Sequence, residues 1–199
     1  MEKFTLLTSA ALPIACANVN TDLILPARYL QKPRSAPFGD YLFHDLRRLP
    51  DGSHDPAFTL NQAPYRGAKI AVGLRNFACG SSREHAVWAL YDHGLRCVIA
   101  PSFSDIFYSN ALKNGLLPVV LDEARVHTII AALLAAPGAQ MTVNLAARTV
   151  TGPDGQQDSF EIAGFSQQCL LNGQDELDYT LSLEARVADY ERSLPAMTA

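Results

Sequence analysis

Three short apolar runs alternate with segments of helical character between residues 69 and 136, and this alternation constrains the fold more than any other feature of the chain. The apolar runs cover residues 69–74, 97–100 and 116–121. The segments that follow them carry helix-forming residues with capping side chains at their starts and glycine or proline at their ends. Shorter runs between residues 141 and 162 surround a Pro-Asp-Gly turn, which is typical of hairpins. Strands alternating with helices, followed by hairpins, predict a layered α/β domain.

The other expected elements are less strongly marked. A first strand is expected over residues 4–16, and a last helix over residues 181–194. Ser104 and Asp122 are the expected N-caps of two helices, because their side-chain oxygens can accept from free backbone N–H groups. Residues 27–40 show no clear period, and a loop of that length is often functional.

Size and charge restrict the class of protein. The chain has 199 residues, 48% of them hydrophobic, which is enough for the core of one globular domain over residues 1–199, with a helical extension over roughly 165–199. A formal net charge of −4 argues against a general nucleic-acid binder. No run approaches the roughly 18 apolar residues of a membrane span, and the N-terminus lacks the layout of a signal peptide. A cytoplasmic location, with no membrane or nucleic-acid partner, is therefore expected.

The cysteines and histidines show no spacing that is typical of a metal site. The four cysteines are far apart in the sequence and form no Cys-x-x-Cys pair: Cys16, Cys79, Cys97 and Cys169. The histidines show no His-Glu-x-x-His pattern either. We therefore expect no metal site made from this chain alone, and if a metal takes part in the function, another chain supplies it.

One segment combines the parts of an anion-binding loop. It follows an expected strand, precedes an expected helix, and consists of Gly80, Ser81, Ser82, Arg83, Glu84 and His85. Gly80 allows a tight turn and a close approach of backbone to ligand. The helix start offers free N–H groups and the positive end of the helix dipole, and Arg83 offers a fork that binds a carboxylate through two hydrogen bonds. These parts suit a small acid with several negative charges.

The residues by themselves leave a second interpretation open. Two serines before a helix are common capping residues, and an Arg-Glu-His sequence is compatible with a solvated first turn. Glu84 and His85 could hold Arg83 or cap the helix. Cys79 is read as a small buried residue rather than a nucleophile. Residue types alone therefore indicate an anion site or a capped helix, and do not decide between them.

Several longer segments resemble one family in the correct order. Residues 80–86 resemble the signature of the swivelling domain of the aconitase superfamily. Residues 18–26 are similar to its N-terminal Asn-Thr-Asp motif, and residues 100–107 and 110–118 resemble the segments that follow its serine loop. Size, motif order and the Cys-Leu-Leu-Asn-Gly tail at 169–173 resemble the small subunits of bacterial isopropylmalate isomerases. The resemblance covers nearly the whole chain and implies a layered β/β/α swivelling domain.

The resemblance also implies an activity. Small subunits of this kind belong to heteromeric hydro-lyases that convert 2-isopropylmalate into 3-isopropylmalate in leucine biosynthesis, by removing water and adding it back in the opposite sense. The chain would be active only with a large subunit that carries a 4Fe-4S cluster, and would bind no cofactor itself. The resemblance makes Ser81 the residue that takes the proton from the substrate, and Ser82 and Arg83 ligands of the substrate carboxylates.

The loop at 27–40 is the expected specificity element, because the resemblance places it against the variable group of the dicarboxylate substrate. Its candidate substrate-binding residues are Arg28, Tyr29, Leu30 and Lys32. A solvated basic loop is the alternative. The candidate supporting residues are Thr21, Asp22, Gly80, Glu84 and His85.

One departure from the family pattern affects the substrate. Val87 stands where many members are expected to have proline. This difference leaves open a paralogous subunit that acts on another branched malate, such as methylmalate or dimethylmalate. A carboxylate-binding module without catalysis is the third interpretation.

Overall fold

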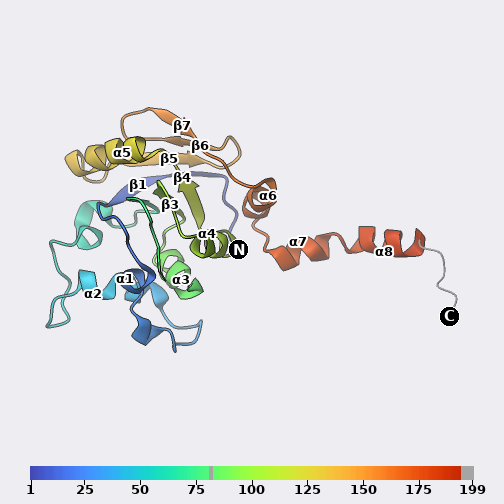
Figure 1. Cartoon of the computed structure of the whole chain (residues 1–199), viewed down its shortest axis with the longest axis horizontal. Coiled ribbons are helices and arrows are strands. Elements are labelled where there is room, and N and C mark those ends of the chain that lie inside the picture. Colours follow the sequence, from blue (N-terminus) through green and yellow to red (C-terminus); the bar gives the residue numbers. More distant parts are fainter. Residues whose placement is uncertain (81–82, 194–199) are drawn as a thin grey trace.

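A single seven-stranded sheet lies at the centre of the computed structural model, which describes residues 1–80 and 83–193 (Figure 1). The strand order is β4-β3-β2-β1-β5-β6-β7. The strands are β1 (Leu6–Ile14), β2 (Ile70–Gly73), β3 (Cys97–Ala100), β4 (Leu117–Val120), β5 (Gln140–Asn144), β6 (Thr149–Thr151) and β7 (Gln157–Ser159). The layered α/β class predicted from the alternation of strands and helices is confirmed.

Strand β1 joins two halves of the sheet that differ in direction. Its carboxyl-terminal part runs parallel to β2, starting with Ala11 opposite Ile70, and β3 and β4 continue the parallel half. Its amino-terminal part runs antiparallel to β5, starting with Leu6 opposite Asn144, and β6 and β7 complete the antiparallel half. The parallel half therefore presents the carboxyl ends of β1, β2 and β3 at one common edge.

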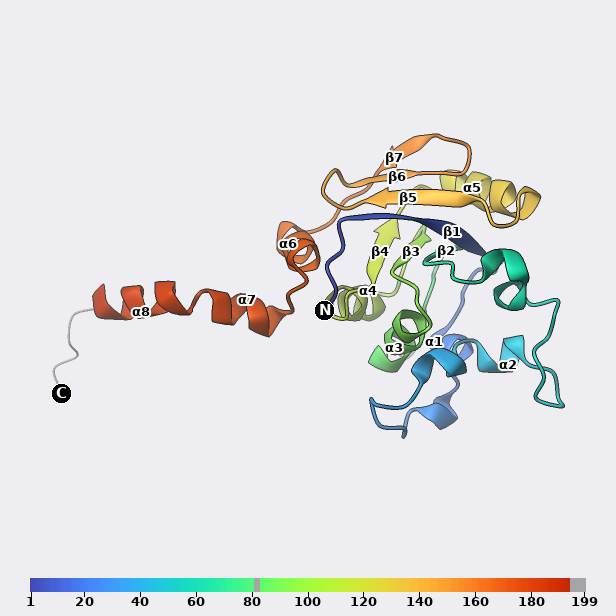
Figure 2. The ribbon, with the colours of Figure 1, turned by 180° about the vertical axis from the view of Figure 1, so that it is seen from behind.

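Helices cover the parallel half on both faces, as Figures 1 and 2 show. The main helices of the body are α3 (Glu84–Asp92), α4 (Asp105–Lys113), α5 (Glu123–Ala135) and α6 (Gly164–Asn172). Ser104 accepts from the backbone N–H of Phe107, and Asp122 accepts from those of Ala124 and Arg125, so both expected N-caps are confirmed.

Side chains that point alternately to the two faces of the sheet form two hydrophobic cores, one on each face. Ala71 and Val98 belong to a cluster shared with α1, α3 and α4, whereas Ile70, Val72 and Ile99 belong to a cluster shared with α5 and the antiparallel strands. Successive side chains of a strand point to opposite faces, so a strand that is buried on both faces is apolar throughout. This accounts for the uninterrupted apolar run of β2.

Short helical turns occupy the connections on the α3 side of the sheet. They are α1 (Thr21–Ile24), α2 (His44–Arg47), and the 3-10 turns η1 (Ala27–Tyr29), η2 (Phe38–Tyr41), η3 (Thr59–Asn61) and η4 (Ala63–Tyr65). The loop expected to be irregular at 27–40 thus contains η1 and most of η2. Turns of three or four residues are too short to give the periodic apolar pattern on which sequence reasoning depends.

The C-terminal segment leaves the body of the protein. Two helices, α7 (Glu176–Ser182) and α8 (Glu184–Ser193), extend away from the sheet (Figures 1 and 2). The helix expected over residues 181–194 is therefore wrong in its bounds: α7 ends before Leu183, which takes a C-cap conformation, and α8 starts after it. No described side chain of α7 or α8 is buried.

Candidate active site

The loop that follows β2 is anchored by the ring of Phe77. This side chain is completely buried and contacts the rings of Phe103 and Phe107, with centroids 6.1 and 6.0 Å away. Gly73 at the end of β2 makes room for it, because a Cβ atom there would lie 2.5 Å from the Phe77 ring. The chain therefore leaves the strand over a fixed aromatic anchor.

Residues 18–21, which follow β1, hold the loop from one side. The backbone N–H of Cys79 donates to the carbonyl of Val19 at 3.2 Å, and the N–H of Thr21 donates to the carbonyl of Cys79 at 3.0 Å. The amide of Asn76 donates to the side-chain oxygen of Asn18 at 2.8 Å. The Asn-Thr-Asp motif and residues 76–79 are thus joined like two short parallel strands.

Residues 102–104, which follow β3, hold the loop from the other side. The hydroxyl of Ser104 donates to the carbonyl of Ala78 at 2.9 Å, so this residue both caps α4 and fixes the loop. The N–H of Asn76 donates to the hydroxyl of Ser102 at 2.8 Å, and the N–H of Phe77 donates to the carbonyl of Ser102 at 2.9 Å. Segments from the carboxyl ends of three parallel strands therefore meet at one edge, which is where open α/β sheets usually bind ligands.

The loop has an unusual backbone. Left-handed φ angles occur at Asn76 (59°), Ala78 (57°) and Gly80 (90°), and at Asn18 (56°) in the segment beside it. Asparagine and glycine adopt this region readily, whereas alanine does so at a cost of roughly 1–2 kcal/mol. Such a conformation persists only when the surrounding contacts impose it, and it is most frequent at functional sites.

Arg83 is held in place by a residue of α1, the short helix that lies within the Asn-Thr-Asp motif. Asn20 caps α1 by accepting from the N–H of Leu23 at 2.8 Å, and this turn carries Asp22. Arg83 is the N-cap residue of α3, and its Nη1 donates to the carboxylate of Asp22 at 2.8 Å. The pair joins two motifs that are 61 residues apart in the sequence. It puts a half-buried guanidinium beside the positive end of a helix, which is an arrangement that attracts carboxylates.

Glu84 and His85 have other partners than Arg83. The carboxylate of Glu84 accepts from the side-chain amide of Asn114 at 2.8 Å, and Asn114 in turn accepts from the indole N–H of Trp88. The ring of His85 packs against Trp88 at 4.4 Å between centroids. Glu84 and His85 could hold Arg83 or cap the helix, and the described contacts do not show either of them on Arg83. The first turn of α3 directs them towards the end of α4 and an aromatic cluster, and Asp22 pairs with Arg83 instead.

The candidate specificity loop is fixed by its own contacts. Both terminal nitrogens of Arg28 contact the carboxylate of Asp45, one of them at 2.9 Å, and the pair keeps the pKa of Asp45 down at about 2. Tyr29 stacks on Tyr41 with centroids 4.1 Å apart. Arg28 is thus engaged within this chain, while Tyr29 and the half-buried Leu30 pack against the core.

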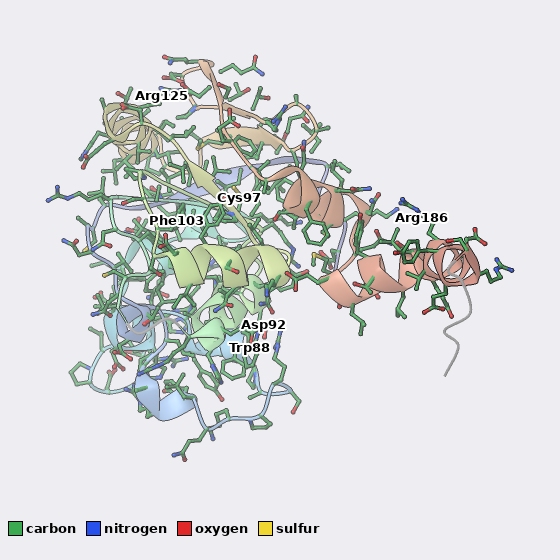
Figure 3. All side chains as sticks on the ribbon, turned by 45° about the vertical axis from the view of Figure 1, so that its right-hand side comes forward. Trp88, Asp92, Cys97, Phe103, Arg125 and Arg186 are labelled. Atoms are coloured by element: carbon green, nitrogen blue, oxygen red, sulfur yellow. The ribbon has the colours of Figure 1, made fainter. Side chains whose placement is uncertain are left out.

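Arg34 is a residue of this loop that sequence reasoning missed. Its guanidinium forms two hydrogen bonds with Asp92, at 2.7 and 2.9 Å, and lies 5.0 Å from the ring centroid of Trp88. Asp92 and Trp88 are both labelled in Figure 3. Arg34 fastens the loop to α3. No local signal links residues 58 positions apart, so only the fold reveals this pair. Lys32, by contrast, lies exposed near the tip of the loop.

Two predicted site residues, Ser81 and Ser82, lie outside the described residues. Gly80 and Arg83 on either side of them are described.

In the part of the chain that the structure describes, no group of three or more His, Cys, Asp or Glu side chains could hold a metal ion. Burial in β3 raises the pKa of the Cys97 thiol. Within the same residues, no helix is both long and apolar enough to cross a bilayer.

A layered α/β domain whose glycine–arginine loop precedes a helix at the carboxyl edge of parallel strands is the arrangement of an aconitase-type swivelling domain. Comparison with known proteins gives the same class. The family model described as "Aconitase C-terminal domain" matches residues 1–124, and a second, described as "LeuD_N", matches residues 128–164.

Individual relatives show to which family within this class the chain belongs. A "3-isopropylmalate dehydratase small subunit" of Paramagnetospirillum magneticum is 47% identical over 97% of this chain and 96% of the relative. One of Rhodospirillum centenum is 49% identical over 96% of this chain and 94% of the relative. The solved structure of 3-isopropylmalate dehydratase (LeuD) from Methanocaldococcus jannaschii has a TM-score of 0.68 at 22% identity, over 93% of this chain and 99% of that one, and so shares its fold. The chain belongs to the family of 3-isopropylmalate dehydratase small subunits.

Proposed function

We propose that the carboxyl-edge site, which we define as residues 18–22, 76–83 and 102–104, is this chain's half of the active site of a hydro-lyase that isomerises 2-isopropylmalate to 3-isopropylmalate in leucine biosynthesis. The observation that carries the proposal is the 2.8 Å pair of Arg83 and Asp22 at the start of α3. It brings a carboxylate-binding group to an edge that is built by three loops. The relatives, which are named small subunits of 3-isopropylmalate dehydratase, support the same substrate.

In this proposal Arg83 binds and orients the substrate. Its planar fork suits one carboxylate of a malate, and the free N–H groups at the start of α3 add to the attraction. Asp22 holds the guanidinium in place, with 54% of its own side chain exposed. Ser82 supplies a hydroxyl donor for the same carboxylate.

Ser81 moves the proton. Its alkoxide takes the proton from the carbon next to a carboxylate, the electron pair of that C–H bond forms a double bond, and the hydroxyl group leaves the neighbouring carbon. Water then adds with its oxygen on the first carbon and gives its remaining proton to the hydroxide that left, and Ser81 returns its own proton to the second carbon. A serine alkoxide is a strong base, so it needs the positive helix end and Arg83 nearby to exist at neutral pH.

The other half of the site belongs to a large partner subunit, as the words "small subunit" in the names of the relatives imply. A 4Fe-4S cluster on that subunit supplies Lewis-acid chemistry for the leaving hydroxyl. The cysteines of this chain do not suit such a cluster, because Cys97 and Cys169 are buried in different elements and no described group of ligands exists. The assembled enzyme acts in the cytoplasm on a small dicarboxylate.

The loop at 27–40 provides the contact for the isopropyl group. The half-buried Leu30 and the stacked ring of Tyr29 offer apolar surface there. Arg28 is neutralised by Asp45, which disfavours a third substrate carboxylate at that position. The loop therefore suits an aliphatic group better than a charged one.

Reconstitution with the large subunit tests the proposal. The pair should turn over 2-isopropylmalate faster than citrate, citraconate, 2-methylmalate or 2,3-dimethylmalate. Replacing Ser81 with alanine should lower kcat at least 1000-fold, on the order expected for loss of a proton-transfer group and its activation. Arg83→Lys should raise KM by about tenfold or more, because one nitrogen replaces a two-pronged contact.

Arg186→Gln, on the exposed helix α8, is the matched control and should leave both constants unchanged (Figure 3). Full turnover by the Ser81→Ala complex would refute Ser81 as the base. If the pair turns over another branched malate but not 2-isopropylmalate, the assignment of 2-isopropylmalate as the substrate is refuted.

A further inference from the structure

One charged side chain is buried in the part of the chain that the structure describes, and it belongs to Arg47 at the end of α2, which is 8% exposed. Its Nε donates to the side-chain oxygen of Asn61 at 3.2 Å, and no described carboxylate forms an ion pair with it. Several other arginines each contact an acidic partner: Arg28, Arg34, Arg83, Arg96 and Arg125. Arg47 is thus the most buried arginine and has only a neutral partner.

A pocket of about 360 Å³ opens beside Arg47. Its polar lining comes from the long connection between β1 and β2 and from the C-cap of α3, and consists of Arg47, His54, Asn61, Tyr65, Arg66 and His93. Arg66 is exposed and, within residues 1–80 and 83–193, also forms no ion pair. A concave pocket of this size, with two guanidinium groups that have no acidic partner among the described residues, is suited to a small ligand that carries negative charge.

The charges around the pocket point to the same class of ligand. Burial and then the charge of Arg48 lower the pKa of Arg47, and Asp40 opposes them only in part. Burial, Arg47 and Arg48 likewise lower the pKa of His54. The Nε of Arg48 is the single buried side-chain polar atom among the described residues that has no hydrogen-bond partner. The region therefore has an excess of positive charge and of N–H donors.

An excess of this kind is costly unless something balances it. A buried cation without an opposite charge loses its hydration and gains little in return, so buried guanidinium groups are normally paired. Asn61 satisfies one N–H group of Arg47 and none of its charge. An anion in the pocket would supply the missing charge and accept from the remaining N–H groups.

We propose that this pocket is a second anion site, which binds a small dianion, either inorganic phosphate or a dicarboxylate, between Arg47 and Arg66. It is separate from the carboxyl-edge site. His93 lies just beyond the last residue of α3, whereas Arg83 precedes the first, and nine helical residues span roughly 13 Å. Nδ1 of His93 lies 3.2 Å from the carbonyl oxygen of Gly39, so the pocket adjoins the η2 turn at the end of the specificity loop.

Calorimetric titration of the full chain with inorganic phosphate tests the proposal, at constant ionic strength maintained with chloride. We expect saturable binding with one site per chain. Arg66→Gln, an exposed position whose replacement leaves the core intact, should weaken it at least tenfold. Arg47→Met, which fills the same space without charge, should abolish it. Arg186→Gln should bind phosphate as the parent chain does.

A second titration, with malate, shows whether the ligand of the pocket is inorganic phosphate or a dicarboxylate. If the ligand is a dicarboxylate, malate should bind more tightly than phosphate, and this binding should survive Arg83→Gln but not Arg66→Gln. The thermal midpoint of the Arg47→Met variant in chloride shows that it is folded. Absence of saturable binding of both anions, or equal binding by the parent chain and Arg66→Gln, would overturn the proposal.

Discussion

At the scale of single residues, Asp22 decides where Arg83 points. The two side chains are 54% and 30% exposed, and ion pairs this exposed contribute only about 0–1 kcal/mol to stability. The role of Asp22 is therefore to fix the orientation of the Arg83 guanidinium rather than to stabilise the fold. A guanidinium on an unpaired side chain samples several rotamers, and each substrate molecule would have to order it again.

We expect Asp22→Ala to raise KM for the dicarboxylate roughly tenfold while it changes the melting temperature by less than about 2 °C. The loss of a fixed orientation is the reason. Steady-state kinetics of the reconstituted enzyme and a thermal melt of the chain provide the two measurements. Asp189→Ala, which removes an exposed aspartate that pairs with Arg192 on α8, is the control. An unchanged KM in the Asp22 variant would contradict this role.

At the scale of elements, β2, the loop and α3 form one unit that depends on Gly73. The strand must end in a residue without a side chain, because the ring of Phe77 occupies the space beside it. On either side of this ring, hydrogen bonds with Asn18, Ser102 and Ser104 hold Asn76 and Ala78 in their left-handed conformations. The position of the loop thus depends on this contact between a glycine and an aromatic ring as well as on the hydrogen bonds with residues 18–21 and 102–104.

Gly73→Ala should lower the free energy of unfolding by about 2–3 kcal/mol, in the range for overpacking of a core. It should also lower the activity of the reconstituted enzyme, since the Phe77 ring must move and the loop moves with it. Urea unfolding and turnover measure the two effects. Gly164→Ala at the start of α6, where a Cβ atom would meet nothing within 4 Å, should leave both unchanged or slightly raise stability. Similar stability of the two variants would contradict the steric argument.

A second element-scale contact fastens the β6–β7 hairpin to α5. Arg125, labelled in Figure 3, donates to Asp154 at 2.5 and 2.9 Å and to Asp158 at 2.6 Å. Its side chain is 9% exposed. The hydrogen bonds from Arg125 keep the pKa of Asp154 at about 2, below that of the unfolded chain. The pair of Arg125 and Asp154 therefore makes the free energy of unfolding depend on pH.

The sign of that dependence follows from the lowered pKa. The stabilisation by Asp154, on the order of 1–2 kcal/mol after allowance for solvent, is complete above about pH 4–5 and is lost as the pH falls towards 2. The difference in unfolding free energy between the parent and Asp154→Asn should follow this course. Denaturant titrations from pH 2 to pH 7 measure it, with Asp189→Asn as control. A difference that stays constant down to pH 2 would contradict the assignment.

At the scale of the whole molecule, the body and the C-terminal arm differ in kind. The body has two cores, one on each face of the sheet. The arm, α7 and α8, keeps its apolar side chains exposed by half or more: Leu177, Leu181, Val187 and Tyr190. Its contacts with the body include an edge-on pair of Phe165 and Tyr179 and an ion pair of Lys113 and Glu176.

Deletion of residues 183–199 should therefore leave the melting temperature within about 2 °C of the full chain, because burial is what links a segment to global stability. Differential scanning calorimetry of the two chains measures this. An equal truncation at the other end, which removes the whole of β1 from the centre of the sheet, should prevent folding. A large drop in the melting temperature on loss of residues 183–199 would show that the arm packs on the body in solution.

Local patterns determined the class of the fold and the location of the loop for which we propose a catalytic role. The apolar runs at 69–74, 97–100 and 116–121 became β2, β3 and β4, because a strand buried on both faces has to be apolar at every position. Ser104 and Asp122 capped the predicted helices, since capping acts within one turn. The resemblance in residues 80–86 indicated the family that the comparisons then confirmed.

Only the tertiary structure decided which distant residues meet. It paired Arg83 with Asp22 rather than with Glu84, tied Arg34 to Asp92, and left Arg47 buried without a carboxylate. These contacts join segments that are separate in the sequence, and they depend on which strands become neighbours in the sheet. Helical periodicity, capping and turn preferences act over a few residues, whereas the choice of neighbours comes from burying both faces of one sheet at the same time.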